Sequence, residues 1–355
     1  MEKAEAEGKI EAAARLVAVV CREVTNHMNT KTPKVVITDW TFPDLSVEEA
    51  LLSEAGIEVV GRQCKSEAEL IQLCADADAI ITQFARVNAN VINTMMRARV
   101  IVRCGIGVDN VDLAAARRRG IPVCNIPDYC VDEVADHALA FVLAATRQVV
   151  PNALHLREGN WGLATPIGAM QTLRHLTVGV IGFGRIGREV VQRLLAFKAC
   201  VLVFDSVVAA AEITKVGAVA ANSLDELLAQ CDIVTPHCPS TPGTKGMFNA
   251  AAFGKMKPGA IFINVGRGDL ADSAALVAAL QSGRLSAAAL DVFDPEPIPA
   301  DHPIRKMPNV ILTPHIASVS VPAVKKLRET AASLALKAVR GDALPNVVND
   351  MAPEK

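Results

Sequence analysis

The stretch Thr177–Arg188, TVGVIGFGRIGR, decides the fold. An apolar segment runs directly into Gly182-x-Gly184-x-x-Gly187, and a helical pattern follows. In a dinucleotide-binding motif the first glycine permits a tight turn and the second lets the backbone approach a pyrophosphate. The third lets the helix pack on the strand, with its free N–H groups facing the phosphates. A structural turn that binds nothing is the alternative for these glycines.

An acidic residue follows at the spacing that this motif requires. The next strand, Cys200–Phe204, ends in Asp205, which lies 23 residues after Gly182. A carboxylate at about 20 residues binds the adenosine ribose hydroxyls and repels a 2′-phosphate. The residues that follow, Ser206–Val208, supply no arginine. The pattern therefore predicts NAD rather than NADP, with Arg185 either on a phosphate or solvated.

Composition narrows the class of protein. The chain has 355 residues, 51% of them hydrophobic, so two domains with sizeable cores are expected. A net charge of −2 provides no basic field for nucleic acid or an anionic membrane. Nine scattered cysteines without a C-x-x-C pair predict no metal site and a reducing compartment, so we expect a cytoplasmic protein.

Short apolar runs alternate with amphipathic stretches along the chain, which is typical of βαβ units and a parallel sheet. We expect an α/β fold with two Rossmann-like halves, a long helix at about 132–150 stopped by Pro151, and a final helix at about 321–339. Residues 1–33 are expected to form an extension that precedes the fold. Strands are expected at 34–38, 57–60, 79–82, 100–103, 122–125, 178–181, 200–204, 261–265, 287–293 and 310–313.

Three polar segments follow strands in the second half. These are Gly266–Asp269 with Arg267, Asp294–Pro297 with Glu296, and Pro314–Ser318 with His315. Hydride transfer from an alcohol needs a base, a cation for the substrate carboxylate, and a group that orients the base. Because ligands sit beyond the carboxyl ends of parallel strands, all three segments are expected at one crevice. Taken singly, each residue could equally be a helix cap, a solvated charge or a structural histidine.

The segments NVGRGD, ALDVFDPEP and LTPHIAS resemble, in order, the three signatures of the D-isomer-specific 2-hydroxyacid dehydrogenases. The resemblance spans about Lys34 to Asn349. It implies that His315 is the acid/base, that Glu296 hydrogen-bonds its imidazole and raises its affinity for a proton, and that Arg267 binds the substrate carboxylate. The implied activity interconverts a small D-2-hydroxy acid and its 2-keto acid.

Further contacts follow from the same resemblance. The substrate-binding residues would be Arg103, Gly105, Ile106 and Gly107 together with Arg267, although Arg103 could equally be a structural ion-pair partner. A slight preference for a cofactor role falls on His237. The cofactor-binding residues would be Gly182, Gly184, Arg185, Ile186, Gly187, Asp205, Cys238, Pro239, Thr244, Val265, Gly266 and Asp291.

The family's architecture also implies domain limits. Residues 34–130 with 319–349 would form the substrate-binding domain, and 131–318 the NAD-binding domain, with the active site in the cleft between them. Relatives are usually dimers through the cofactor domain, so a homodimer is expected.

Two rival functions stay open. Some stretches, such as YCVDEVADH, are similar to the C-terminal-binding-protein corepressors, which favours an NAD(H)-responsive regulatory protein on the same scaffold. Ser318 stands where those corepressors carry a tryptophan, and the intact Arg267, Glu296 and His315 favour an enzyme. A dehydrogenase of an inorganic oxyanion such as phosphite would use the same chemistry. Phosphoglycerate also stays open as a substrate.

Overall fold

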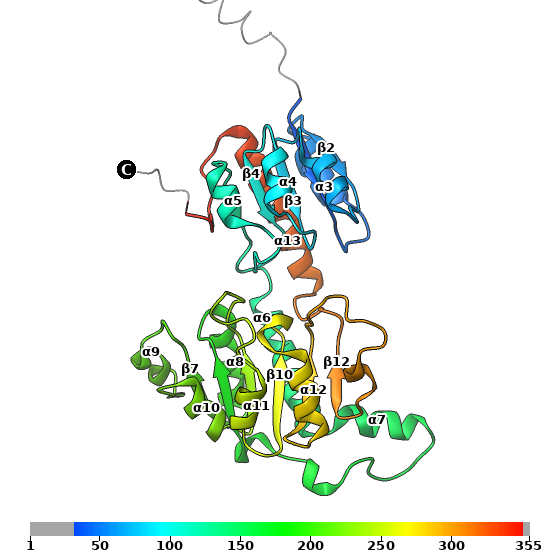
Figure 1. The fold of residues 1–355 in the computed structure, drawn as a ribbon, viewed down its shortest axis with the longest axis vertical. Coiled ribbons are helices and arrows are strands. Elements are labelled where there is room, and N and C mark those ends of the chain that lie inside the picture. Colours follow the sequence, from blue (N-terminus) through cyan, green and yellow to red (C-terminus); the bar gives the residue numbers. More distant parts are fainter. Residues whose placement is uncertain (1–31, 351–355) are drawn as a thin grey trace, which may run out of the picture. The chain divides into compact units, whose positions relative to one another are not determined.

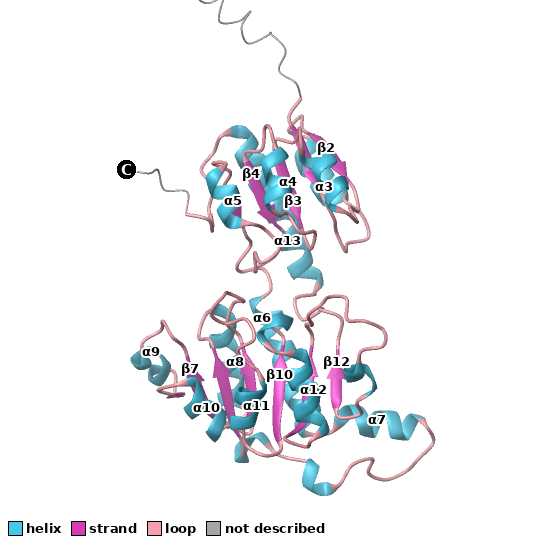
Figure 2. Cartoon of the chain, viewed as in Figure 1, coloured by secondary structure: helices cyan, strands magenta, loops and turns pink. Residues whose placement is uncertain are grey.

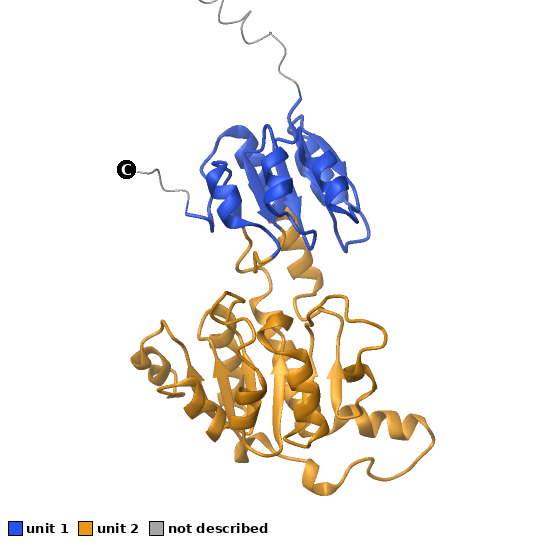
Figure 3. Cartoon of the chain, viewed as in Figure 1, with its two compact units in different colours: residues 1–103, 110–124, 331–355 blue, residues 104–109, 125–330 orange. Residues whose placement is uncertain are grey.

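The computed structural model describes residues 32–350, and the chain forms two compact units (Figure 3). Unit 1 takes its residues from 1–103, 110–124 and 331–355, and unit 2 takes 104–109 and 125–330. The extension predicted at 1–33 lies outside the described residues except for its last two. The units change over at 124/125 and 330/331, whereas the predicted functional limits are 130/131 and 318/319, and these limits stay a prediction.

Unit 1 is a parallel five-stranded sheet in the order β2-β1-β3-β4-β5. Helices α3, α4 and α5 are each preceded by a capping residue, respectively Ser66, Asn88 and Asp112. The side chain of each capping residue accepts the backbone N–H three residues further on, which has no acceptor within the helix. The elements are β1 (Lys34–Ile37), α2 (Ser46–Ser53), β2 (Glu58–Gly61), α3 (Glu67–Cys74), β3 (Ala79–Thr82), α4 (Ala89–Thr94), β4 (Val100–Arg103), α5 (Leu113–Arg118) and β5 (Val123–Cys124).

Unit 2 is a parallel seven-stranded sheet in the order β12-β11-β10-β9-β6-β7-β8 (Figures 1 and 2). The chain starts at β6 in the middle, goes outward to β8, and then returns to β9 on the other side of β6. The elements are α6 (Val131–Thr146), α7 (Val149–Arg157), β6 (Thr177–Ile181), α8 (Arg185–Ala196), β7 (Cys200–Phe204), α9 (Ala210–Lys215), β8 (Val219–Ala220), α10 (Leu224–Gln230), β9 (Ile233–Pro236), α11 (Ala250–Lys255), β10 (Ala260–Asn264), α12 (Ser273–Gln281), β11 (Leu285–Leu290) and β12 (Val310–Leu312). The last helix, α13 (Val321–Arg340), divides between the units at 330/331.

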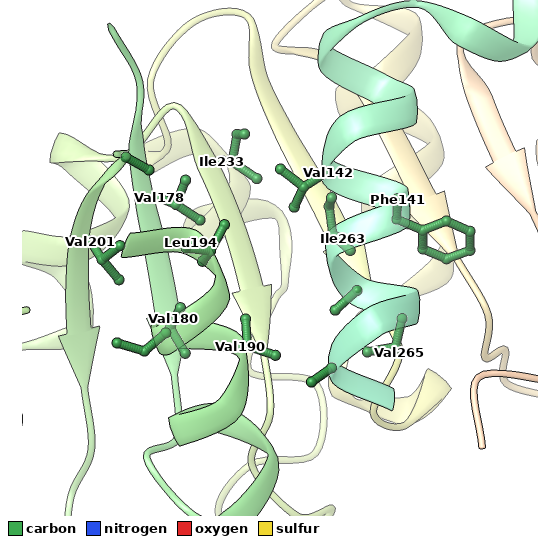
Figure 4. Packing of buried hydrophobic residues seen from close by; sticks show 14 of the residues in the cluster. Phe141, Val142, Val178, Val180, Val190, Leu194, Val201, Ile233, Ile263 and Val265 are labelled. Atoms are coloured by element: carbon green, nitrogen blue, oxygen red, sulfur yellow. The ribbon is translucent and has the colours of Figure 1, made fainter. Parts of the chain in front are cut away.

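Both faces of this sheet are covered. Val178 and Val180 of β6 pack with α6 and α8 on one face, as Figure 4 shows. Ile181 of the same strand belongs to a second cluster that includes buried side chains of α10, α11 and α12. Because alternate residues of a strand point to opposite faces, a strand buried on both sides must be apolar throughout. This explains the continuous apolar runs of the sequence, and it confirms the predicted α/β fold with two Rossmann-like parallel sheets.

The predicted helix over 132–150 is wrong in one respect. The structure ends α6 at Thr146, places Gln148 in the left-handed region with φ 52°, and starts α7 at Val149. Pro151 therefore lies in the first turn of a second helix rather than after the end of one. A first turn tolerates proline because its N–H groups have no acceptor within the helix. None of the helices among residues 32–350 is both long enough and apolar enough for a membrane span.

Candidate active site

The glycine loop joins β6 to α8 in unit 2. Gly182 adopts φ 95°, and its N–H donates to the carbonyl oxygen of Phe204, 2.8 Å away. A Cβ on Gly187 would lie 2.0 Å from the carbonyl oxygen of Gly182, so close packing of helix and loop requires this glycine. A Cβ on Gly184 would meet no protein atom within 4 Å. The protein's own packing therefore does not require Gly184, and the open space above it fits the approach of a dinucleotide phosphate.

Asp205 lies directly after β7, beside this loop. Its Oδ2 accepts the N–H of Phe183 at 2.6 Å, and its Oδ1 accepts those of Val207 and Val208 at 2.8 and 2.9 Å. Burial raises the pKa of the Asp205 carboxyl, but these three hydrogen bonds and the nearby Arg188 guanidinium hold it below its ordinary value overall. The carboxylate is therefore charged at neutral pH and holds the glycine loop through the N–H of Phe183.

The segment that follows β9 packs against the glycine loop. A Cβ on Gly182 would lie 2.8 Å from the carbonyl carbon of His237, so the two backbones are in direct contact. The His237 ring hydrogen-bonds Thr235 Oγ1 through Nε2 at 3.0 Å, and burial lowers the pKa of this imidazole to about 4. His237 is thus neutral at pH 7. Its ring binds Thr235 of β9 and its backbone lies against Gly182, which favours a structural role over the cofactor role preferred from sequence.

The loop Cys238–Thr244, predicted to contact the cofactor, is held by hydrogen bonds within itself. Thr244 Oγ1 donates to the carbonyl oxygen of Pro239 at 2.6 Å and accepts the N–H of Thr241 at 2.8 Å. Ser240 donates to Asp269 at 2.8 Å, which ties this loop to the segment after Arg267. Burial raises the pKa of the Cys238 thiol to about 11, so the side chain is an uncharged neighbour of the loop.

Arg267 follows β10 and is held on two sides. Its Nε donates to Asp109 Oδ1 at 2.9 Å and its Nη1 to the carbonyl oxygen of Gly266 at 2.9 Å. The turn itself is fixed by Asn264, whose buried amide accepts the N–H of Gly266 and donates to the carbonyl oxygen of Arg267. The guanidinium lies against Gly107, since a Cβ there would be 1.8 Å from Nη2. Arg267, the predicted carboxylate-binding residue, is therefore adjacent to the predicted substrate-binding segment Gly105–Gly107.

His315 and Glu296 meet at the ends of β12 and β11. Nδ1 of His315 and Oε2 of Glu296 are 2.8 Å apart, and Oε1 of Glu296 accepts the N–H of Phe293 at 2.7 Å. The two side chains are 26% and 31% exposed, so the pair is accessible while its geometry is fixed. A carboxylate on Nδ1 sets the imidazole tautomer and directs Nε2 away from the pair.

Unit 2 thus contains the glycine loop, Asp205, Arg267, Glu296 and His315. It also contains Gly105–Gly107, which the sequence had assigned with Arg103 to the other domain. Arg103 ends β4 in unit 1, where it is buried. Arg185 is exposed at the start of α8, and Ile186 is half-buried against the core. Val265 is buried in the core, so any contact of Val265 with a cofactor would come from its backbone. The roles assigned to all these residues stay predictions.

Sequence reasoning missed several residues that support the site. Asp109 lies in the stretch IVRCGIGVDNVD, whose glycines were singled out, and Asn264 directly precedes the arginine segment. Both residues could have been found from the sequence, because each is a polar residue at the end of a strand or loop. Within residues 32–350 no group of three or more His, Cys, Asp or Glu side chains could hold a metal ion.

Comparison with known proteins agrees with this geometry. Residues 139–317 match the model of the D-isomer specific 2-hydroxyacid dehydrogenase NAD binding domain. The chain is 38% identical over 318 residues to the D-3-phosphoglycerate dehydrogenase of Mycobacterium tuberculosis, covering 89% of this chain and 59% of that protein. It therefore spans about three fifths of the length of this curated relative.

Solved structures give the same result over almost their whole length. The TT0316 protein of Thermus thermophilus is 37% identical with a TM-score of 0.80, covering 89% of this chain and 99% of that one. The D-lactate dehydrogenase of Aquifex aeolicus, solved with NAD and lactic acid, is 29% identical with a TM-score of 0.78, covering 87% and 96%. The chain belongs to the D-isomer specific 2-hydroxyacid dehydrogenase family, and residues 139–317 match the NAD binding domain of that family.

The contact between Gly107 and Arg267 leads to a testable prediction. In Gly107→Ala the new Cβ displaces the guanidinium, which is the far end of a flexible side chain, so the melting temperature stays within about 3 °C. The affinity of the NADH-loaded protein for oxamate, a carboxylate analogue of a 2-keto acid, falls at least about tenfold by calorimetry. Gly254→Ala, whose Cβ meets no atom within 4 Å, is the matched control. Unchanged oxamate affinity in Gly107→Ala would contradict the assignment of Arg267 to the carboxylate.

Proposed function

We propose that this protein is an NAD-dependent oxidoreductase that interconverts a small D-2-hydroxy acid and its 2-keto acid. The observation that carries the proposal is the pair His315–Glu296, 2.8 Å apart, in the same parallel-sheet unit as the glycine loop and Arg267. A proton-transferring imidazole, a carboxylate that orients it and a guanidinium form the set that this reaction needs. Relatives named D-3-phosphoglycerate and D-lactate dehydrogenase support the reaction class.

The roles of the residues follow from their contacts. Glu296 binds Nδ1 of His315, so proton transfer to and from the substrate oxygen falls to Nε2. In the reducing direction Nε2 gives a proton to the keto oxygen, and in the oxidising direction it takes the hydroxyl proton. NAD, when bound, accepts the hydride in oxidation, and NADH supplies it in reduction. Arg267 pairs with the substrate carboxylate and polarises the adjacent carbonyl, while Asp109 and Gly266 hold its guanidinium in place.

The glycine loop, Asp205 and the loop around Pro239 and Thr244 would hold the cofactor. We include Arg185, Ile186, Cys238 and Asp291 in the cofactor site, and Arg103 with Gly105–Gly107 in the substrate site. The identity of the acid is left to experiment, because the named relatives act on different ones.

The proposed reaction is tested with a panel of 2-keto acids. Wild-type protein is assayed by loss of NADH absorbance with glyoxylate, hydroxypyruvate, pyruvate and phosphohydroxypyruvate. Oxidation of phosphite by NAD is assayed by gain of NADH absorbance. At least one keto acid is reduced, and His315→Ala lowers its kcat about 100-fold or more, because one general acid contributes at least that much. The affinity for NADH stays within about threefold, since no cofactor contact is removed.

The control is His175→Ala, which removes an exposed histidine outside the site and retains wild-type turnover. Wild-type-like turnover in His315→Ala would overturn the catalytic assignment. NADH binding without reduction of any acid would instead support the NAD(H)-responsive binding protein, and turnover of phosphite alone would support the oxyanion enzyme.

A second prediction concerns the choice of cofactor. The charged Asp205 disfavours a 2′-phosphate, so kcat/KM with NADH exceeds that with NADPH by at least about 100-fold. Asp205→Asn removes the charge and shifts this ratio at least about tenfold toward NADPH. Asp232→Asn is the matched control, because Asp232 likewise accepts a backbone N–H, that of Thr177, at the end of β6 opposite the glycine loop. A preference for NADPH in the wild-type protein would refute the role of Asp205.

We also propose a homodimer, assembled through α7 and the segment that follows it. Helix α7 has no buried residue, and its apolar side chains Leu154 and Leu156 are more than half exposed. Trp161 and Ile167, further along, are 92% and 76% exposed. Several large exposed apolar side chains in one segment are typical of an interaction site, and a second copy of the same unit is the partner that the family suggests.

This surface gives a prediction for the oligomeric state. In sedimentation experiments the wild-type protein has twice the mass of the chain, and the double variant Leu154→Glu/Trp161→Ser has the mass of one chain, because burying a new charge in an apolar interface is costly. Phe197→Ser, at another exposed apolar position, remains dimeric. A dimer in the Leu154→Glu/Trp161→Ser variant would exclude this surface.

A further inference from the structure

We propose that His137, on helix α6, is a positioning residue for the His315 turn and acts through Thr313 and Asp291. The proposal rests on the proposed function, since it assigns a role toward the proton-transferring histidine. His137 makes no hydrogen bond to His315 or Glu296 in the described contacts. It reaches the turn through two polar side chains, the half-buried Thr313 and the buried Asp291.

The last residue of this hydrogen-bond network is Asp291, which binds three successive backbone N–H groups of the turn. Its backbone carbonyl oxygen accepts the N–H of His315 at 2.8 Å. Its Oδ1 accepts the N–H of Ile316 and its Oδ2 that of Ala317, each at 2.8 Å. The Asp291 side chain is fully buried, so these bonds are not exchanged with water. Asp291 therefore determines the path of the backbone at residues 315–317.

The turn needs this support. His315 has φ 53°, in the left-handed region, which is unfavourable for a residue other than glycine. The direction of its imidazole follows from this backbone conformation. A relaxed turn would carry Nδ1 away from Glu296 Oε2, and the proton-transferring Nε2 would move with it.

Thr313 links Asp291 to helix α6. Its hydroxyl donates to Asp291 Oδ1 at 2.5 Å, and His137 Nε2 lies 3.1 Å from the same hydroxyl oxygen. The hydroxyl has one hydrogen, which the carboxylate takes, so toward His137 it can only accept. His137 must therefore carry a hydrogen on Nε2 and donate. The same Nε2 lies 3.9 Å from Asp291 Oδ1, so its N–H also lies near the buried carboxylate.

Helix α6 fixes the ring of His137. The imidazole packs edge-on against Phe141, one turn further along, with 4.5 Å between the ring centroids. Phe141 and the neighbouring Ala138 belong to the core on the sheet. The donor therefore comes from a rigid element rather than from the loop that it supports, which is what holding a strained turn requires.

The test compares two variants of the full-length protein with NADH. His137→Gln keeps an N–H donor near the position of Nε2, whereas His137→Leu keeps the bulk and loses the donor. We expect His137→Leu to lower kcat between roughly 10- and 100-fold, the size of effect that a misplaced catalytic group produces, with the Kd for NADH within about twofold. His137→Gln recovers most of the loss. His175→Leu is the control and retains wild-type kcat.

The coupling through Thr313 has its own measurement. Thr313→Val removes the hydroxyl that links His137 to Asp291. Adding His137→Leu to this variant is therefore expected to lower kcat no further. Additive losses in the double variant, an unchanged kcat in His137→Leu, or an equal loss in His137→Gln and His137→Leu would each overturn the proposal.

A spectroscopic readout separates this proposal from the proposed function. The ¹⁵N signals of the His315 imidazole, assigned by their loss in His315→Ala, are expected to shift in His137→Leu in the direction seen for Glu296→Gln. They report the turn whether or not a keto acid is reduced. His315 signals that stay at their wild-type positions in His137→Leu refute the positioning role. Shifted signals in a protein that reduces no keto acid refute the proposed function alone.

Discussion

The strands of the unit 2 sheet run parallel, so every segment that follows a strand leaves the sheet at the same edge. This constraint gathers side chains that are more than 130 residues apart in the sequence. The strand order reverses between β6 and β9, which is where open α/β sheets bind their ligands. The residues that follow the strands are the glycine loop after β6, Asp205 after β7, His237 after β9, Arg267 after β10, Glu296 after β11 and His315 after β12.

A second constraint acts at this edge, because turns that carry functional groups need fixed backbones. Polar side chains at or just beyond the strand ends supply the fixing bonds. Asn264 holds the turn of Arg267, Asp291 holds that of His315, and Asp205 holds the glycine loop through the N–H of Phe183. A hydrogen bond to a charged group contributes about 1.5–3 kcal/mol, enough to maintain a left-handed residue at the site. The hydrogen bonds of Asn264, Asp291 and Asp205 therefore help to set the geometry of the site.

Sequence reasoning reached the main features of this arrangement because they are local. The spacing of Gly182, Gly184 and Gly187 and the position of Asp205 depend on a strand, a loop and a helix that follow one another in the chain. The two-sided burial of the sheet left its mark as uninterrupted apolar runs. The roles of Arg267, Glu296 and His315 came from the family resemblance, and the fold then placed Glu296 against His315. Where two signals competed, as at Pro151, the pattern could not distinguish a helix end from a second helix that begins.

The sequence by itself determined that this is an α/β protein with a glycine-rich loop between a strand and a helix, and it predicted that the loop binds a dinucleotide and that an acidic residue binds the ribose. These follow from periodicity and from spacings of about 20 residues, which one βαβ unit spans. Only the tertiary structure decided that Asp109 holds Arg267, that Asp291 holds three amides of the His315 turn, and that His137 reaches that turn through Thr313. These contacts join residues between 22 and 176 positions apart. Hydrogen bonds over such separations depend on how helices pack on a sheet, and residue order alone does not specify that packing.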